Sequence, residues 1–231
     1  MTYDIAVIIN ARIQSTRVKN KLLRSFYNTT LLEIALDKLS KINNCNERYL
    51  AACDKEIISL HSKHSNEVNL LERKPESVVK GQISHLVAFE HFKKVKSTYI
   101  MILNPCHPFT TVDLYKNAIE YFFTNNLTSL TSVSEKNNIY FNDRFEAINL
   151  SNKKEVSTQN QKNIYEMAHV FHIFNKNNFI QNGILWNFTK GDPSCFVVNK
   201  KEALDIDDEL DFLISELLYT NEKTNIISSN V

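Results

Sequence analysis

Short aliphatic runs alternate along this chain with segments of helical periodicity, and this alternation constrains the fold more than any other feature. Residues 5–9 form an apolar run of the kind that is buried on both faces of a parallel sheet. Further strands are predicted at residues 49–53, 99–103, 130–133 and 170–174, and helices at residues 31–39, 55–64, 83–92, 112–123 and 210–219. Such alternation predicts an α/β fold with a doubly wound, mostly parallel sheet, whose ligands bind beyond the carboxyl ends of the strands.

A long irregular segment interrupts this pattern between about residues 135 and 161, where Asn, Lys and Ser are frequent. Loops of that length usually have a function. The last helix, residues 210–219, is expected to be strongly amphipathic, and the residues after it are expected to form a frayed tail. The 231 residues suit one domain, predicted to span residues 1–231.

Composition excludes several classes of protein. The 27 basic and 26 acidic residues nearly cancel, so no overall field would draw the chain to nucleic acid or to an anionic membrane. No segment approaches the roughly 20 apolar residues of a membrane span, and the start of the chain does not suit a signal peptide. The four cysteines are scattered without a C-x-x-C pair, as is typical of reduced thiols. We expect a cytoplasmic protein.

A cationic loop follows the first predicted strand, at the position where such a sheet presents its ligand. Its cations lie around Ser15 and Thr16 and are Arg12, Arg17, Lys19 and Lys21. Arginine can bind a phosphate through two parallel hydrogen bonds and lysine through a mobile charge, so the loop suits a polyphosphate. A solvated basic turn is the alternative, because many loops of this kind carry charge.

An acidic segment, DIDDEL, precedes the last predicted helix. Alternation along an extended chain would place Asp205 and Asp207 on one side, where their repulsion favours a cation between them. Mg²⁺ held by carboxylates and completed by phosphate oxygens and water is the usual solution. Asp208 and Glu209 are instead expected to stabilise the start of the helix. Together, the loop and the acidic pair suggest a Mg-nucleoside triphosphate, although the loop contains no glycine and is not a Walker A motif.

Several short motifs occur in an order that matches one enzyme family. Residues 11–21, ARIQSTRVKNK, match the signature A-R-x-x-S-x-R-x-x-x-K, and residues 203–212, ALDIDDELDF, match D-I-D-x-x-x-D-F. LNPCHPF at residues 103–109 is similar to L-Q-P-T-S-P-L, CDKEI at residues 53–57 to T-D-x-E-I, and RKPES at residues 73–77 to an Arg-Pro element near the base. In these motifs the chain resembles the CTP-dependent sugar-acid cytidylyltransferases, and within them the acylneuraminate (CMP-sialic acid synthetase) branch.

The resemblance implies a Rossmann-like nucleotidyltransferase in which Mg²⁺ is held by Asp205 and Asp207. The nucleotide-binding residues that it implies are Arg12, Ser15, Arg17, Lys21, Arg73 and Lys74. Catalysis would depend on Arg12, Lys21 and Asp207, and an anionic acceptor would contact Asn104 and His107. The family's reaction has an acceptor hydroxyl attack the α-phosphorus of CTP and expel pyrophosphate, here for surface-glycan biosynthesis.

The irregular segment corresponds, in this resemblance, to an arm that completes the neighbouring subunit's acceptor site. An arm over residues 134–175 and a homodimer are therefore expected, with neither nucleic acid nor a membrane as partner.

The chain also departs from the family pattern. Ile13 and Gln14 stand where the sialate branch has two glycines, and an Asn-Gly of the acceptor pocket is replaced within residues 165–169. Two alternatives stay open: a cytidylyltransferase acting on a phosphate or phosphonate acceptor, and a non-catalytic nucleotide-binding homologue.

Two histidines and a tryptophan are further candidate site residues. His169 and His172 are three residues apart in a predicted strand, so they are expected on opposite faces and unable to share a metal. Trp186 is expected in the core rather than as a binding platform.

Overall fold

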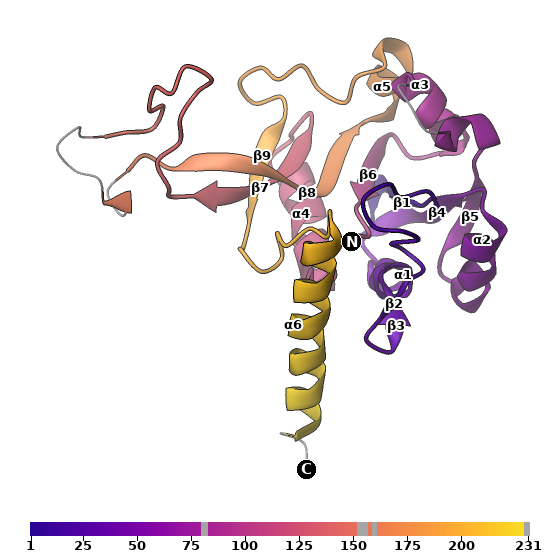
Figure 1. The fold of residues 1–231 in the computed structure, drawn as a ribbon. Coiled ribbons are helices and arrows are strands. Elements are labelled where there is room, and N and C mark those ends of the chain that lie inside the picture. Colours follow the sequence, from indigo (N-terminus) through magenta and orange to yellow (C-terminus); the bar gives the residue numbers. More distant parts are fainter. Residues whose placement is uncertain (80–82, 152–156, 159–160, 229–231) are drawn as a thin grey trace.

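A computed structural model describes residues 1–79, 83–151, 157–158 and 161–228 of the chain. The described residues form a seven-stranded sheet in the order β5-β4-β1-β6-β8-β7-β9 (Figure 1). Its strands are β1 (Tyr3–Asn10), β4 (Cys45–Ala52), β5 (Asn69–Glu72), β6 (Tyr99–Leu103), β7 (Leu130–Lys136), β8 (Ile164–Asn175) and β9 (Ser194–Val198). A small antiparallel pair, β2 (Ser25–Phe26) and β3 (Thr29–Thr30), lies apart from this sheet.

The sheet has a parallel half and a mixed half. β5, β4, β1 and β6 run parallel, and Ile8 of β1 lies beside Ile102 of β6. β8 is antiparallel to both β6 and β7, and β7 is parallel to β9. The predicted α/β fold with a mostly parallel sheet is confirmed. Because β1 and β6 are neighbours, the loops that follow them meet at one edge of the sheet.

Helices cover both faces of the sheet. They are α1 (Leu31–Lys41), α2 (Lys55–His61), α3 (His85–Ala88), α4 (Val112–Thr124), α5 (Lys176–Asn182) and α6 (Glu209–Ser228), with 3₁₀ segments η1 (Ser62–His64), η2 (Pro75–Val78) and η3 (Glu90–Lys94). Alternate residues of β1 enter two apolar clusters: Ile5, Val7 and Ile9 pack with α1 and α4, whereas Ala6 and Ile8 pack on the other face with Phe92 and Phe179. This explains the uninterrupted apolar run in β1.

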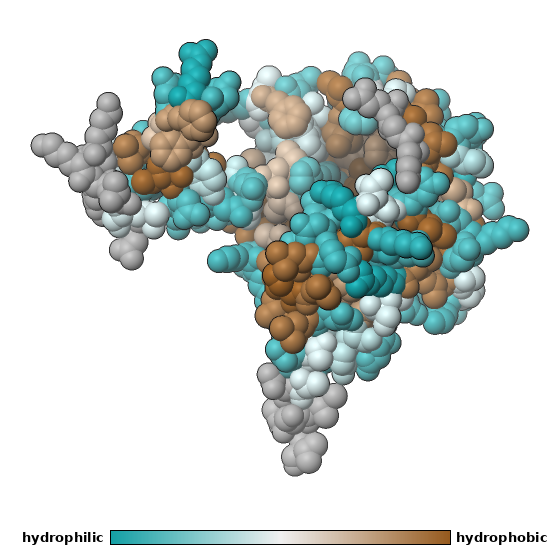
Figure 2. Space-filling view, in the orientation of Figure 1, coloured by the Kyte–Doolittle hydropathy of each residue, from teal (hydrophilic) through white to brown (hydrophobic). Residues whose placement is uncertain are grey.

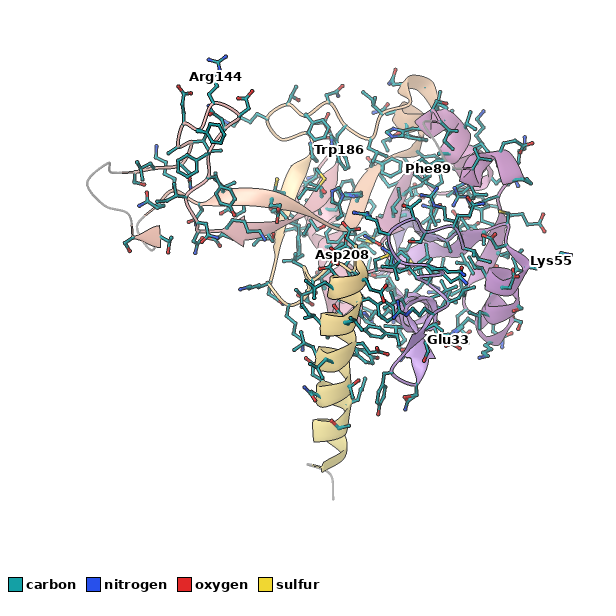
Figure 3. All side chains as sticks on the ribbon, in the orientation of Figure 1. Glu33, Lys55, Phe89, Arg144, Trp186 and Asp208 are labelled. Carbon is teal, nitrogen blue, oxygen red and sulfur yellow. The ribbon has the colours of Figure 1, made fainter. Side chains whose placement is uncertain are left out.

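Three differences from the predicted elements are the largest. The helix expected at residues 83–92 is divided into α3 and η3 at Phe89 (labelled in Figure 3), whose φ of −122° and ψ of 29° are not helical. The Phe89 ring stacks on Phe92, with 5.1 Å between centroids. The frayed tail expected after residue 219 is wrong for residues 220–228, because α6 continues to Ser228. β8 begins at Ile164, six residues before the predicted strand.

Part of the segment expected to form an arm, residues 134–175, projects from the molecule between β7 and β8 (Figure 1), whereas residues 171–175 pair with β6 in the main sheet. Residues 152–156 and 159–160 of this arm lie outside the described residues. None of the helices in the described part of the chain combines the length and the apolar character needed to span a bilayer.

Candidate active site

Three segments that are far apart in sequence converge at the carboxyl edge of the parallel strands. The cationic loop follows β1, residues 104–110 follow β6, and the DIDDEL segment leads into α6. Lys21 Nζ donates to the Ile206 carbonyl at 2.5 Å, and the Ile206 N–H donates to the Cys106 carbonyl at 3.1 Å. The two charged segments predicted to cooperate are therefore adjacent.

Arg17 and Asp207 connect the same two segments through their side chains. Arg17 Nη2 lies 2.6 Å from Asp207 Oδ1, and the side chains are 63% and 47% exposed. An ion pair so open to water contributes about 0–1 kcal/mol, so a phosphate or a cation can compete for either partner at little cost.

Asp205 and Asp207 lie on one side of an extended segment, because Ile206 between them points into the core. Burial, and then the charge of Asp207, raises the pKa of Asp205 to about 6. Its buried Oδ1 has no hydrogen-bond partner among the described residues. A divalent cation would relieve both the repulsion and the unsatisfied oxygen, so this carboxylate pair fits Mg²⁺. The described residues hold no group of three or more His, Cys, Asp or Glu around one position, so substrate oxygens and water would complete the shell.

The start of α6 is capped as predicted for Asp208 (Figure 3). Asp208 Oδ1 accepts from the Asp211 N–H at 2.9 Å, and Asp211 Oδ2 accepts in return from the N–H groups of Asp207 and Asp208, both at 3.0 Å. This reciprocal capping box fixes the backbone of Asp207. Glu209 instead pairs with Arg24 at 2.5 Å.

Arg73 has a different surrounding from the one expected of a nucleotide-binding residue. Its guanidinium is buried and donates to Ser77, to the Ala88 carbonyl at 3.0 Å and to the Ala11 carbonyl at 3.4 Å. Burial lowers its pKa. Arg73 thus anchors the start of the cationic loop from behind, whereas Lys74 is exposed at the start of η2.

Asp54, which the sequence argument did not single out, holds the same loop. Its Oδ2 accepts the Ile13 N–H at 3.1 Å. The sequence signal for this role is the CDKEI motif, in which Asp54 directly follows the strand predicted at residues 49–53. The Ile13 N–H is therefore occupied, whereas the side chains of Arg12 and Ser15, exposed and half-buried respectively, carry donors that a ligand could reach.

The two predicted acceptor residues separate in the structure. Asn104 lines a cavity of about 380 Å³ and its Oδ1 accepts the Cys106 N–H at 3.0 Å. His107 is wrong as an acceptor contact, because its side chain is fully buried and its Nε2 lies 2.9 Å from the Ala168 carbonyl. His107 Nδ1 lies behind Asp205, 3.9 Å from its Oδ1, and burial lowers the pKa of His107 to about 4.

The cavity lies at the carboxyl edge between β6, β8 and the acidic segment. Its lining residues are Asn10, Arg17, Ile102, Leu103, Asn104, Pro105, His169, His172, Asp205 and Asp207. It therefore joins the carboxylate pair to a floor of apolar residues and to amide and imidazole side chains.

Regular strand geometry predicted His169 and His172 on opposite faces, but in the structure their side chains are in contact. His169 Nδ1 lies 3.2 Å from His172 Nε2, because His169 has a positive φ of 54° and interrupts the alternation of β8. Trp186 is buried, as expected, and packs on the His172 ring with 5.1 Å between centroids.

Comparison with known proteins identifies the fold and a family. Residues 6–220 match the family model described as cytidylyltransferase. No curated protein sequence matches the chain.

Solved structures resemble the chain over most of its length. CMP:2-keto-3-deoxy-manno-octonic acid synthetase, complexed with CTP, has a TM-score of 0.69 at 12% identity, over 94% of this chain and 99% of that one. The 4-diphosphocytidyl-2C-methyl-D-erythritol synthase of Anaerococcus prevotii has a TM-score of 0.64 at 15% identity, over 94% and 96% of the two chains. The bifunctional IspDF of Campylobacter jejuni gives 0.60 at 15% identity, over 90% of this chain and 53% of that one.

Proposed function

This chain belongs to the cytidylyltransferase family and is a nucleotidyltransferase, and from that premise we propose that it transfers CMP from CTP to a hydroxyl group of an acidic sugar of the nonulosonic type, for surface-glycan biosynthesis. In this reaction the acceptor oxygen bonds to the α-phosphorus while the bond to the β-phosphate oxygen breaks. Pyrophosphate leaves and the hydroxyl proton is released.

The observation that carries the proposal is the junction of the cationic loop with the carboxylate pair. Lys21 contacts the backbone between Asp205 and Asp207, and Arg17 contacts Asp207 directly. Anion-binding donors and cation-binding oxygens thus occupy one edge of the sheet, as a metal-bound triphosphate requires.

The phosphates would be bound by side chains of the cationic loop. Arg12 and Ser15 carry donors that face solvent, and Lys21 supplies a half-buried charge at the foot of the loop. Phosphoryl transfer depends mostly on positioning and on neutralising charge, so we assign catalysis to Arg12, Lys21 and Asp207. Arg73 contributes by holding the loop through the Ala11 carbonyl.

Mg²⁺ is the proposed cofactor, held by Asp205 and Asp207. When bound, it would neutralise charge on the phosphates of the nucleotide. The unsatisfied, buried oxygen of Asp205 supports this assignment.

The cavity beside the carboxylates is the proposed acceptor site. Its apolar floor and its amide and imidazole groups suit a hydroxylated ring. A phosphate or phosphonate acceptor would need more fixed positive charge than Arg17, the single Lys or Arg among the described residues that line this cavity. We therefore keep that acceptor as the second candidate.

A homodimer is proposed from the projecting arm. Phe141 and Phe145, which lie in the arm between β7 and β8, are 61% and 87% exposed. Exposed apolar groups of that size on a projection are typical of a surface that another chain covers.

The test is release of pyrophosphate from CTP with N-acetylneuraminate or 3-deoxy-manno-octulosonate as acceptor. Turnover of either acid by the wild-type chain, and loss of at least about a hundredfold in rate in Asp207→Asn, would support the proposal. Unchanged turnover in Asp207→Asn would refute the site.

Calorimetry with CTP and Mg²⁺ separates the remaining alternatives. Metal-dependent CTP binding without turnover on sugar acids, phosphates or phosphonates would favour the non-catalytic homologue. Turnover confined to a phosphate or phosphonate would favour the second candidate.

A further inference from the structure

We propose that His169 binds a hydroxyl group of the sugar acceptor, and that His172 and Thr131 are positioning residues that fix its imidazole. The inference rests on the proposed function, whose acceptor cavity it describes in more detail. Four observations carry it: a bulge in β8, a chain of hydrogen bonds, the contents of the cavity and the backbone conformation of His169.

The bulge turns His169 out of the regular strand. Thr131 of β7 pairs with His172, but Val133, two residues further on, pairs with Met167 rather than with Val170. β8 therefore has extra residues between these two pairs. The fully buried Ser132 holds them, because its Oγ accepts the N–H groups of Val170 at 2.9 Å and Phe171 at 3.2 Å. Bulges that are supported in this way commonly re-aim a side chain beside a site.

A chain of hydrogen bonds then orients the His169 ring. Thr131 Oγ1 lies 2.8 Å from His172 Nδ1, and His172 Nε2 lies 3.2 Å from His169 Nδ1. In a neutral imidazole one nitrogen donates and the other accepts, so these two hydrogen bonds can form with the donors pointing in either direction. His169 Nε2 has no hydrogen-bond partner among the described residues, which leaves it available to a ligand in the cavity.

The cavity that both histidines line offers amide and imidazole groups beside the carboxylate pair. Among the described lining residues Arg17 is the single permanent cation, and it is paired with Asp207 at 2.6 Å. Asn10, Asn104 and the His169 ring supply hydrogen-bond donors and acceptors. Such groups recognise hydroxyls, and a site that hydrogen-bonds a hydroxyl discriminates strongly against analogues that lack it.

The backbone conformation of His169 is unfavourable, and burial of its side chain does not compensate for this. Its φ of 54° lies in the left-handed region that favours glycine, and its side chain is exposed. Because the side chain adds nothing to the core, a strained and exposed histidine at a cavity points to recognition.

The test compares His169→Gly with Asn126→Gly in pyrophosphate release, using N-acetylneuraminate and 3-deoxy-manno-octulosonate. Both variants place glycine at a positive φ, but Asn126 follows α4, away from the cavity. We expect His169→Gly to raise the KM of the acceptor at least about tenfold with the KM of CTP within about twofold, and with no loss of thermal stability. Asn126→Gly should leave both KM values unchanged.

Two more variants test the separate roles of His169 and His172 in this row of hydrogen bonds. His169→Asn, which tolerates the left-handed region and retains a hydrogen-bonding group, should recover part of the acceptor affinity. His172→Phe keeps a ring against Trp186, and it should raise the acceptor KM less than His169→Gly does. The double variant His169→Gly/His172→Phe should be no worse than His169→Gly alone, because His172 acts only through His169.

An unchanged acceptor KM in His169→Gly, with wild-type turnover intact, overturns this inference and leaves the proposed function standing. Additive effects in the double variant overturn the positioning role of His172. No turnover of either acid by the wild-type chain overturns the sugar-acid acceptor, and with it the role of His169 toward that acceptor.

Discussion

Lys21 is the residue that connects the two charged segments most directly. Its ammonium donates to the Ile206 carbonyl at 2.5 Å, between the two carboxylates of the acidic pair. Lys19, two residues earlier in the same loop, is exposed to solvent. The two lysines therefore form a matched pair in which one charge is placed in the site and the other is not.

We predict that Lys21→Ala lowers kcat/KM for CTP by about 100- to 1000-fold, the loss typical of removing one donor to developing charge. Lys19→Ala should stay within about threefold of the wild type. Steady-state pyrophosphate release at saturating acceptor measures both. Equal activity of the two variants would remove Lys21 from the site.

His91 is a buried titratable residue outside the site, and it links stability to pH. Its side chain is buried and its Nε2 lies 2.7 Å from Asn10 Oδ1. Burial, followed by the charges of Arg73 and Lys94, lowers the pKa of His91 from 6.5 to about 3. Between these values the unfolded chain binds a proton that the folded chain does not, so stability falls as pH falls below 6.5.

The expected contribution of His91 is about 1.4 kcal/mol for each pH unit in that window. His91→Gln has no group that titrates there. Urea unfolding of both proteins without Mg²⁺ at about pH 7 and about pH 5.5 should therefore show a smaller loss of stability in the variant, by about 1 kcal/mol. An equal loss in both proteins would mean that His91 is protonated in the folded state.

At the scale of elements, α6 depends on the capping box that also holds Asp207. Replacing Asp208 with Ala removes the acceptor of the Asp211 N–H and should lower the free energy of unfolding by about 1 kcal/mol. Asp208→Ser, which retains a capping oxygen, should recover most of that loss. Chemical denaturation measures both, and equal stability of Asp208→Ala and Asp208→Ser would contradict the cap.

Elements with a strong local signal were predictable from sequence. β6 has the predicted bounds, and α1 and α4 differ from the prediction by one or two residues at their ends. β5 was missed because its four residues, Asn69–Glu72, contain only the adjacent Leu70 and Leu71 as apolar residues, which is too short a run to form a pattern. The division at Phe89 was missed because it depends on aromatic packing against Phe92 and Phe179.

The site was predictable where topology alone brings its parts together. The cationic loop and the acidic pair meet because both lie at the carboxyl edge of one sheet. The burial of Arg73 and the contact between His169 and His172 were not predictable. The first depends on carbonyls of distant segments, and the second on a bulge that Ser132 supports from the neighbouring strand.

At the scale of the whole molecule, two apolar surfaces of the described residues are candidates for contact with another chain. One is on the arm, at Phe141 and Phe145. The other is a stripe along α6, visible as a brown cluster over that helix in Figure 2. The residues of this stripe are Leu210, Leu213, Ile214, Leu217 and Leu218. Their spacing of three and four residues places them on one face of the helix.

We predict that the arm, rather than the α6 stripe, joins two copies of the chain. Sedimentation equilibrium of the wild type should give twice the mass of one chain. Phe141→Ser combined with Phe145→Ser should weaken this association at least about tenfold, because exposed aromatic groups commonly carry the binding energy of an interface. Leu213→Ser combined with Leu217→Ser is the matched control, with two apolar side chains removed from the other surface, and should leave the mass unchanged. If the double variant in α6 dissociates and the double variant in the arm stays dimeric, the interface lies on the helix instead.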